Sequence, residues 1–281
     1  MQTEAALKQM VREKYSEIAS QEKETNMSSC CGAGGCSTEV YNIMSEDYSS
    51  LAGYQADADL GLGCGLPTQF AHIKQGDVVI DLGSGAGNDC FIARHEAGPT
   101  GKVIGIDFTP AMIEKARRNA DVRGYNNVEF RQGDIEHMPV ASDVADVVVS
   151  NCVLNLVPNK DGVFKEIFRV LKPGAHFSIS DVVLSGNLPD ALRKVAEMYA
   201  GCVSGAIQKE VYLELIRLNG FTNMTIQKEK PIIIPDDILS RYLDAAGIEA
   251  MKNGTSGIFS ITVYAEKPGQ EKACTPGGGC C

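Results

Sequence analysis

The sequence predicts an α/β fold built around a parallel β-sheet, and three observations lead to this prediction. From Gly76 onward, short apolar segments alternate with helical segments, which is the pattern of βαβ units. A Gly-rich turn follows the first apolar segment, and acidic residues follow the ends of successive segments. Apolar residues make up 44% of the 281 residues, which is enough to fill the core of a full-sized domain.

The N-terminal part is predicted to form one helix followed by a loop. Apolar residues recur at helical spacing over residues 5–19, so we expect an amphipathic helix that docks on the rest of the chain. Residues 25–38 are small, polar and rich in Gly, which is typical of a loop. Residues 39–66 have a mixed composition, so we expect irregular structure there with room for one short helix.

The central part supplies most of the predicted sheet. Apolar segments predict strands at residues 78–82, 103–106, 128–131, 144–150 and 176–184. Helical patterns predict helices at residues 89–96, 110–122 and 161–171. We expect Thr109 to be the N-cap of the second helix, with Pro110 in its first turn. The Lys172-Pro173-Gly174 break is expected to end the third helix.

The C-terminal part is predicted to extend the same fold. Helices are expected near residues 189–200 and at 208–219, followed by a strand at 222–229, a helical insert at 236–246 and a last strand at 257–265. The tail from residue 267 onward is rich in Gly, so we expect it to be flexible.

Charge and hydropathy exclude several functional classes. The 26 basic and 36 acidic side chains give a net charge of −10, which argues against binding duplex nucleic acid or anionic membranes. No apolar run approaches the roughly 18 residues of a membrane span, and the N-terminus lacks the apolar core of a signal peptide. We therefore expect a cytoplasmic protein. In that reducing compartment, ten cysteines indicate metal binding or thiol chemistry more than a disulfide framework.

The segment VVIDLGSGAGND carries the first chemical signal. Asp81 ends the first strand, and the glycines at 83, 85 and 87 let the following turn approach a ligand closely. Asp107 ends the next strand, where a ribose-binding carboxylate belongs, and Asp134 follows the third strand. Carboxylates disfavour a pyrophosphate ligand beside this turn. They suit the zwitterionic tail and sulfonium of S-adenosylmethionine.

Residues 75–185 therefore resemble the Rossmann-like, class I methyltransferases that use S-adenosylmethionine. The resemblance implies a sheet with helices on both faces. It also implies that Asp81 and the turn face the methionine moiety, that Asp107 binds the ribose, and that Asp134 and Ile135 reach the adenine, against which Phe108 and Met112 pack. The donor-binding residues implied in this way are Asp81, Gly83, Ser84, Gly85, Gly87, Asp107, Phe108, Met112, Asp134, Ile135 and Asn151.

Three cysteines lie in distinctive contexts and are candidates for the acceptor site. The segment SNCVLNLVP places Cys152 directly after a strand end, near the expected position of the reactive methyl group. Asn151 is followed by Cys152, unlike the N-P-P-Y segment of amino-methylating nucleic-acid enzymes. Cys64 lies in GLGCGLP and Cys202 in AGCVSGA, and no C-x-x-C pair of a zinc site joins these three. Cys90 is expected to be a buried, small apolar residue.

Five segments together resemble the arsenite methyltransferase family. They are DLGSGAGNDC, SNCVLNLVP, KPGAHFSISDV, GCVSGA and GLGCGLP, and the match runs from about Cys30 to about Gly220. The resemblance implies methyl transfer from S-adenosylmethionine to arsenite or its thiol conjugates, with Cys64, Cys152 and Cys202 as the ligands of As(III). The domains implied are an N-terminal helix with a Cys-containing acceptor segment (1–70), a donor-binding domain (71–230), a C-terminal insert with the last strand (231–267) and a flexible Cys-rich tail (268–281).

The same resemblance implies a redox step. A thiol reductant of the thioredoxin or glutathione type would reopen a disulfide formed after each transfer. Cys31 matches the family's further N-terminal cysteine by its Cys-Cys context, Cys36 matches by its distance from Cys64, and Cys30 also competes. The tail cysteines at 274, 280 and 281 are candidates for arsenic capture. Leu62 stands where many family members have an aromatic residue, for which Tyr48 or Tyr54 are candidate substitutes.

Two other functional classes remain open from the sequence. One is a methyltransferase that acts on a small organic nucleophile, which should need an acid–base residue in the acceptor pocket. The four histidines, at positions 72, 95, 137 and 176, mostly resemble surface or loop residues. The other is a thiol sensor that binds metalloids without catalysis. We expect a monomer in each case.

Overall fold

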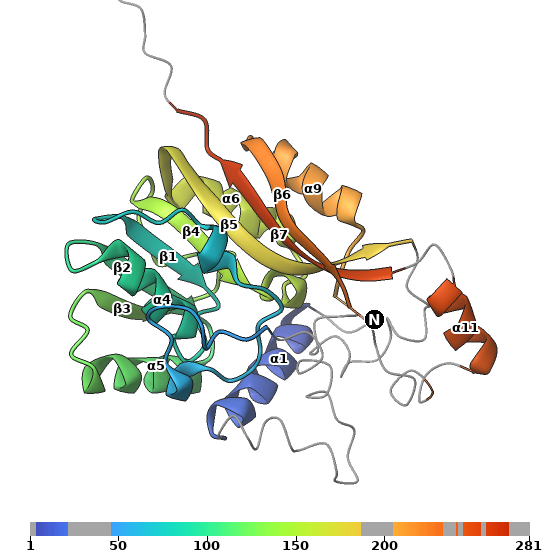
Figure 1. Cartoon of the computed structure of the whole chain (residues 1–281), viewed down its shortest axis with the longest axis horizontal. Coiled ribbons are helices and arrows are strands. Elements are labelled where there is room, and N and C mark those ends of the chain that lie inside the picture. The colour runs from blue at the N-terminus through green and yellow to red at the C-terminus, as the bar shows by residue number, and fades with distance from the viewer. Residues whose placement is uncertain are drawn as a thin grey trace, which may run out of the picture.

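The computed structural model describes residues 4–21, 46–186, 205–232, 240, 244–253 and 257–269. Within these residues, seven strands form one sheet in the order β3-β2-β1-β4-β5-β7-β6 (Figure 1). The strands are β1 (Val78–Leu82), β2 (Lys102–Asp107), β3 (Val128–Gln132), β4 (Ala145–Asn151), β5 (Leu171–Ser185), β6 (Thr222–Pro231) and β7 (Gly257–Glu266). The five strands β1 to β5 run parallel, whereas β7 is antiparallel to both β5 and β6. The predicted α/β class is thus confirmed.

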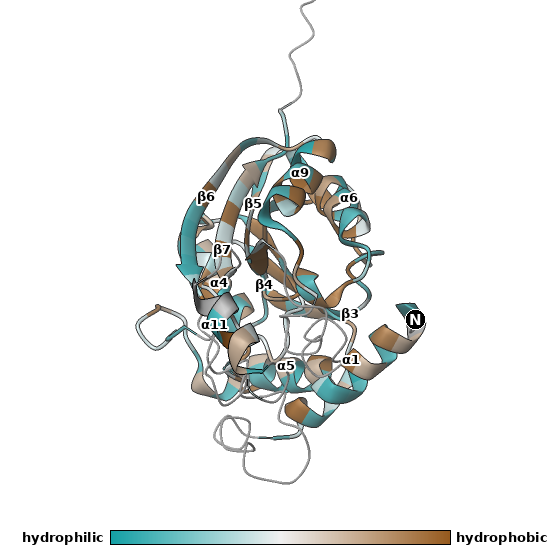
Figure 2. Ribbon diagram, turned by 90° about the vertical axis from the view of Figure 1, so that its right-hand side faces the viewer, coloured by the Kyte–Doolittle hydropathy of each residue, from teal (hydrophilic) through white to brown (hydrophobic). Residues whose placement is uncertain are grey.

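Helices cover both faces of the sheet. The described α-helices are α1 (Glu4–Ala19), α4 (Asn88–Ala97), α5 (Pro110–Val122), α6 (Lys160–Val170), α9 (Lys209–Leu218) and α11 (Ala245–Asn253). Short 3-10 helices lie at η2 (Ala56–Ala58), η3 (Pro67–Phe70) and η4 (Leu154–Leu156). Figure 2 shows α6 and α9 together on one side of the sheet and α4 on the other. None of the helices described is both long and apolar enough to cross a lipid bilayer.

The alternation of side chains along the strands explains the two layers of the core. Val79 of β1 points to the layer that contains Phe91 of α4, whereas the next residue, Ile80, points to the layer that contains Phe164 of α6. All of these side chains are buried. Because both faces of the parallel strands are covered, their sequences are continuously apolar rather than alternating.

The N-terminal helix closes one side of the molecule. Ile18 and Ala19 of α1 pack in a cluster with Leu60, Ala86 and Met112. The ammonium group of Lys115 on α5 donates hydrogen bonds to the carbonyl oxygens of residues 19 and 21, at the end of α1. The amphipathic helix predicted for residues 5–19 therefore docks on the sheet domain, as expected.

Most predicted strands and helices are confirmed within one or two residues, and β5 is the main difference. Leu171 already pairs with Ala145, and the next pairing joins His176 to Val147. The intervening residues therefore form an irregular stretch inside β5, where Gly174 has φ = 81° and donates its N–H to the carbonyl of residue 267. The Lys-Pro-Gly break does not separate helix from strand, because α6 ends at Val170 and β5 begins at the next residue.

Other expectations differ in detail or fall outside the described residues. Thr109 is the N-cap residue of α5, but its side chain makes no capping hydrogen bond. The segment 39–66 contains only the short η2 within its described residues. The helix predicted near residues 189–200, most of the insert predicted at 236–246 and the tail beyond residue 269 lie outside the described residues.

Candidate active site

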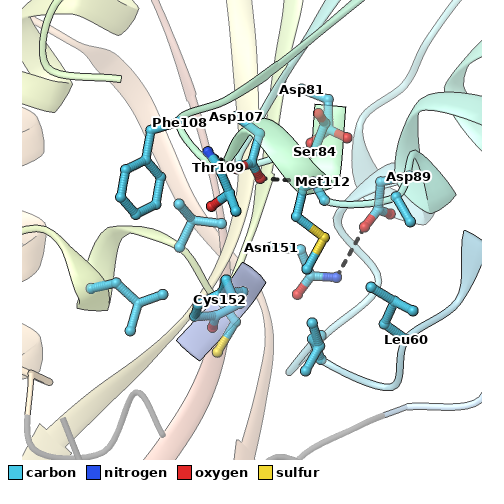
Figure 3. Close-up of a pocket in the computed structure, with 18 of the residues that line it drawn as sticks. Leu60, Asp81, Ser84, Asp89, Asp107, Phe108, Thr109, Met112, Asn151 and Cys152 are labelled. Atoms are coloured by element: carbon cyan, nitrogen blue, oxygen red, sulfur yellow. Dashed lines mark hydrogen bonds between the residues drawn. The ribbon is translucent and has the colours of Figure 1, made fainter. Parts of the chain in front are cut away.

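A pocket of about 1100 Å³, part of it open to solvent, lies at the carboxyl ends of β1, β2 and β4. This is the point where the strand order changes direction between β1 and β4, which is the usual ligand position in such sheets. Many of the predicted site residues line it: Asp81, Gly83, Ser84, Gly85, Asp107, Phe108, Met112, Asp134, Ile135, Asn151 and Cys152. In the view of Figure 3, Asp81, Ser84 and Asp107 lie toward one end of the pocket, and Cys152 lies toward the other.

The Gly-rich turn shapes the floor of the pocket. Gly83, Gly85 and Gly87 all have positive φ angles, of 66°, 50° and 99°, which residues with a Cβ rarely adopt. A Cβ at Gly85 would meet no atom within 4 Å, so this part of the backbone is open to a ligand. Gly87 does not line the pocket. A Cβ there would lie 2.9 Å from the rings of Phe130 and Phe91, so Gly87 is required for packing behind the turn.

Three buried carboxylates, those of Asp81, Asp89 and Asp107, give this end of the pocket its electrostatic character. Burial, followed by the nearby Asp89 carboxylate, raises the pKa of Asp81 well above its usual value. Burial also raises the pKa of Asp89 to about 6, against hydrogen bonds from Asn151, Tyr48 and Thr68 that lower it. Buried carboxylates that are costly to ionise favour a ligand that brings positive charge and disfavour an anionic one.

Asp107 is held rigidly at the end of β2. One carboxylate oxygen accepts the N–H of Thr109 at 2.8 Å, and the other accepts the N–H of Gly85 at 3.0 Å. Burial raises the pKa of Asp107, and these two N–H groups oppose the shift. The Asp107 carboxylate therefore joins the Gly-rich turn to the start of α5 and lines the pocket from between them.

The opposite wall of this end is formed by α5, α1 and the segment after β3. Met112 is fully buried. The centroid of the Phe108 ring lies 5.4 Å from the guanidinium carbon of Arg12 on α1. The ammonium group of Lys8, also on α1, bonds to Asp134 at 2.9 Å and contacts Glu136. Burial opposes the charged form of Lys8, but the bonds to these two acids outweigh it and raise its pKa.

Cys152 lies at the other end of the pocket, directly after β4. Its side chain is only 3% exposed, and its N–H donates to the carbonyl of Ser180 on β5 at 2.8 Å. Cys152 has φ = 60°, a left-handed conformation that is uncommon outside Gly, Asn and Asp. Such strain persists where surrounding contacts impose it, and it is frequent at functional sites. Cys152 thus lines the pocket directly after the end of β4.

Cys64 lies beside this end of the pocket without lining it. The Cys64 side chain is fully buried, whereas the preceding residue, Gly63, does line the pocket. The N–H of Cys64 donates to Asn151 Oδ1 at 3.0 Å, and its carbonyl accepts a bond of 2.6 Å from the Ser260 hydroxyl on β7. A Cβ at Gly65 would lie 2.5 Å from Ser180 Oγ. The glycine beside Cys64 therefore lets this loop press against β5.

A buried tyrosine of α9, Tyr212, has a raised pKa. Burial, the carboxylate of Asp181, and the thiols of Cys64 and Cys152 all raise the pKa of Tyr212. Its hydroxyl donates to Asp181 at 3.3 Å, and burial raises the pKa of that acid to about 7, against the charge of Lys160.

The remaining eight cysteines divide into one described residue and seven others. Cys90 is fully buried and its thiol donates to Asp81 Oδ2 at 3.2 Å, which confirms the expected buried position. Burial, followed by the charge of Asp81, raises its pKa well above the usual value. The other seven lie outside the described residues: Cys30, Cys31, Cys36, Cys202, Cys274, Cys280 and Cys281, of which Cys202 was a predicted ligand. Within the described part, no three His, Cys, Asp or Glu side chains form a group suited to a metal ion.

Several residues of the site were not predicted from the sequence. Asp89 lines the pocket, and its position directly after the Gly-rich turn was a signal that could have identified it. By contrast, Tyr48 was already a candidate from the sequence, and it lines the pocket whereas Tyr54 does not; Leu62 lines it as well. Lys8 and Tyr15 of α1 complete the wall, although nothing in the helical pattern distinguishes them from other residues of an amphipathic helix.

The central part of the chain is similar to a known protein family. A family model described as a methyltransferase domain matches residues 73–220. An arsenic(III) S-adenosylmethionine methyltransferase from Chlamydomonas reinhardtii, known from its crystal structure, superposes with a TM-score of 0.63 at 33% sequence identity. The superposition covers 74% of this chain and 69% of that chain.

Two curated relatives extend the similarity beyond the domain. An arsenite methyltransferase of Halobacterium salinarum is 43% identical over 264 residues, which cover 87% of this chain and 66% of that protein. An arsenite methyltransferase of Aquipseudomonas alcaligenes is 32% identical over 272 residues, which cover 94% of this chain and 73% of that protein. The chain thus spans roughly two thirds to three quarters of the length of these relatives.

Proposed function

Because the chain belongs to the arsenite methyltransferase family, we propose that it transfers a methyl group from S-adenosylmethionine to trivalent arsenic held by cysteine thiolates. One observation carries this proposal. The pocket that contains the Gly-rich turn and the buried carboxylates is also lined by Cys152, in a strained backbone conformation. A cationic donor and a thiophilic acceptor would therefore meet in one space.

The donor end of the pocket fits S-adenosylmethionine in charge and in hydrogen bonding. When bound, this donor supplies an electrophilic methyl group on a positively charged sulfur. Asp81 and Asp89 offset positive charge on the ligand, which makes their own ionised forms less costly. Among the described residues, no group hydrogen bonds to Ser84 Oγ or Asn88 Oδ1, although both are buried and both residues line the pocket. These two oxygens are suited to polar groups of the donor.

The nucleoside part of the donor would lie between β2, β3 and α5. The carboxylate of Asp107 is oriented by two backbone N–H groups, and in this proposal it accepts hydrogen bonds from the ribose hydroxyls. Phe108 and Met112 would flank the adenine, and Asp134 with Ile135 would contact its edge. Lys8 forms ion pairs with both Asp134 and Glu136, so α1 forms part of the wall around this base.

In the proposed reaction, the thiolates of Cys64, Cys152 and Cys202 hold As(III) as a trigonal pyramid. Soft thiolates are suited to this thiophilic centre, whose lone pair lies opposite the three sulfurs. The lone pair is the nucleophile, so the pocket needs no side chain that removes a proton. The cysteines act by positioning, and alignment of two bound reactants can lower a barrier by up to roughly 7–11 kcal/mol.

A reductant completes the proposed cycle. After transfer the arsenic is formally pentavalent, and two thiols return it to the trivalent state by forming a disulfide. We propose that Cys31 or Cys36, with Cys30 as a further candidate, takes part in this step, and that a thioredoxin- or glutathione-type thiol reopens the disulfide. The reducing cytoplasm would supply that thiol. A monomer would suffice, because one chain provides every residue of the described pocket.

The proposal is tested by incubating the purified chain with arsenite, S-adenosylmethionine and a thiol, and separating the arsenic species by chromatography. We expect methylated arsenic to appear as the donor is consumed. Unchanged arsenite, together with methylation of a small organic nucleophile, would instead identify the second class of methyltransferase. Stable arsenite binding without donor consumption would identify a thiol sensor.

A further inference from the structure

The side-chain amide of Asn151 lies between the two ends of the pocket and bonds to groups on both sides. Its Nδ2 donates to the carbonyl of Gly65 at 2.8 Å, to the carboxylate of Asp89 at 3.2 Å and to the hydroxyl of Tyr48 (Figure 3 shows the bond to Asp89). Its Oδ1 accepts the N–H of Cys64 at 3.0 Å and the N–H of Gly65 at 3.3 Å. These groups come from three segments that are distant in the sequence.

The bonding capacity of this amide is already used by the protein. An Asn side chain offers two N–H hydrogens and an oxygen with two lone pairs. The two backbone N–H donors of Cys64 and Gly65 identify the oxygen end and occupy both lone pairs. Three acceptors surround the two hydrogens of Nδ2. Although Asn151 lines the pocket, its amide therefore has no polar atom left over for a donor molecule.

The same contacts hold the two cysteine segments relative to each other. Asn151 directly precedes Cys152, whose N–H is bound to the carbonyl of Ser180. Cys64 is held through its N–H by Asn151 and through its carbonyl by Ser260. A Cβ at Gly63 would lie 2.7 Å from Asn151 Nδ2, so the loop approaches the amide as closely as a glycine allows.

We propose that Asn151 is a positioning residue that sets the location of Cys64 relative to Cys152, rather than a ligand of the methyl donor. The inference rests on the proposed function, in which both cysteines bind the arsenic. One side chain, at the end of β4, fixes the loop that carries one thiol and begins the segment that carries the other. Loss of the amide should therefore displace the Cys64 backbone while the donor end keeps its carboxylates.

The test uses the full chain with Asn151→Ala. Exchange of the Cys64 and Gly65 amide hydrogens should become about three- to tenfold faster, as expected for the loss of one hydrogen-bond acceptor. Binding of S-adenosylhomocysteine, measured by calorimetry, should stay within about twofold of wild type because the donor carboxylates remain. In turnover assays, the KM for arsenite should rise much more than the KM for S-adenosylmethionine.

Asn127→Ala is the matched control. Asn127 also joins separate segments, since its oxygen accepts from Arg94 at 3.2 Å and its nitrogen donates to the carbonyls of Gly98 and Gly101 at 3.0 Å each. These contacts lie beside the amino end of β2, whereas the pocket lies at the carboxyl ends of the strands. This variant should lose comparable hydrogen bonds yet leave exchange at Cys64 and both KM values unchanged.

A second variant keeps the test decisive if Asn151→Ala does not fold. Gly63→Ala displaces the amide from the loop side, and it should accelerate exchange at Cys64 and raise the KM for arsenite in the same way. Unchanged exchange combined with a more than tenfold loss of S-adenosylhomocysteine affinity would overturn the proposal and make Asn151 a donor ligand. The exchange and calorimetry arms need no arsenic. If wild type fails to methylate arsenite while these arms behave as expected, the proposed function is wrong but the positioning role stands.

Discussion

The donor end and the acceptor end of the pocket are built in different ways. The donor end is formed mainly by residues at or next to strand ends, with Asp81 and Asp107 on either side of the Gly-rich turn. At the acceptor end, the loop at Cys64 is bonded to Asn151 at the end of β4 and to the hydroxyl of Ser260 on β7. Cys152 is bonded through its N–H to a carbonyl of β5. The donor end has buried charge, whereas the acceptor end has backbone hydrogen bonds that locate thiols.

This difference separates the residues that set the affinity for the methyl donor from the residues that set the positions of the thiols. Changes at the donor end should weaken donor binding and leave the reactivity of the thiols unchanged. Changes at the acceptor end should reduce turnover while the donor still binds. The following variants test the separation, in order of decreasing effect.

Cys152→Ser should have the largest effect. Removal of one arsenic ligand tilts the nucleophile away from the methyl group, and a misplacement of about 1 Å can lower a rate on the order of 100-fold. We expect methylation of arsenite to become undetectable or nearly so, while calorimetry shows unchanged binding of S-adenosylhomocysteine. Cys90→Ser is the control, since that buried side chain would keep a donor toward Asp81. Substantial methylation by the Cys152 variant would contradict its role as an arsenic ligand.

Asp107→Asn should have the largest effect on the donor. Hydrogen bonds to charged groups contribute about 1.5–3 kcal/mol, so the Kd for S-adenosylhomocysteine should rise about 10- to 150-fold. Asp146→Asn removes a carboxylate that also accepts a backbone N–H, from Val78, but at the other end of the sheet, and it should leave this Kd unchanged. Equal losses in both variants would mean that the effect is on stability and not on the donor.

Asp89→Asn should change the pH dependence of stability. Burial raises the pKa of Asp89 from 3.8 to about 6, so between these values the folded protein binds more protons than the unfolded chain. The stability of wild type without ligand therefore falls as pH rises through this window, by on the order of 3 kcal/mol. The variant cannot ionise, so its melting temperature should rise relative to wild type between pH 4 and pH 7.5. A difference that does not vary with pH would refute the buried, ionising carboxylate.

Tyr48→Phe should have a smaller effect that reaches both ends. The Tyr48 hydroxyl bonds to the carbonyl of Gly65 at 3.0 Å and to Asp89 at 3.1 Å. A hydrogen bond of this kind contributes about 0.5–1.5 kcal/mol, so kcat/KM should fall about two- to twelvefold. Tyr264→Phe, which loses only a bond to Glu266, is the control and should match wild type. Wild-type kinetics in the Tyr48 variant would show that this hydroxyl is dispensable.

Lys8→Met should have the smallest effect. The Lys8 side chain is 28% exposed, and ion pairs with access to solvent contribute about 0–1 kcal/mol. The Kd for S-adenosylhomocysteine should therefore rise no more than about fivefold, and the difference from wild type should shrink at high salt. A much larger, salt-independent loss would show that Lys8 contacts the donor directly.

The contrast between the two ends also explains what could be predicted from the sequence. The strands, the Gly-rich turn, Asp81 and Asp107 follow local patterns, because a buried parallel strand and a tight turn each constrain a few consecutive residues. The irregular stretch at Gly174 could not be predicted in the same way. It depends on the pairing of Leu171 with Ala145 and on a bond to residue 267, which are contacts between distant segments.

The acceptor end is harder to predict for the same reason. Cys64 and Tyr48 lie in a segment without helical or strand periodicity, so only a family resemblance singled out Cys64. The bonds of Asn151 to Cys64 and Asp89 join residues 62 to 87 positions apart in the sequence. A residue whose role depends on such contacts is recognised from the structure, as its full set of hydrogen bonds shows.

The central claim is that three cysteines from distant segments hold arsenic beside the donor. X-ray absorption at the arsenic edge, on the full chain with one equivalent of arsenite and S-adenosylhomocysteine, measures the ligands of the arsenic directly. We predict three sulfur neighbours in wild type and two in each of the variants Cys64→Ser, Cys152→Ser and Cys202→Ser. Arsenic that keeps oxygen neighbours in wild type, or three sulfurs in all three variants, would contradict the account.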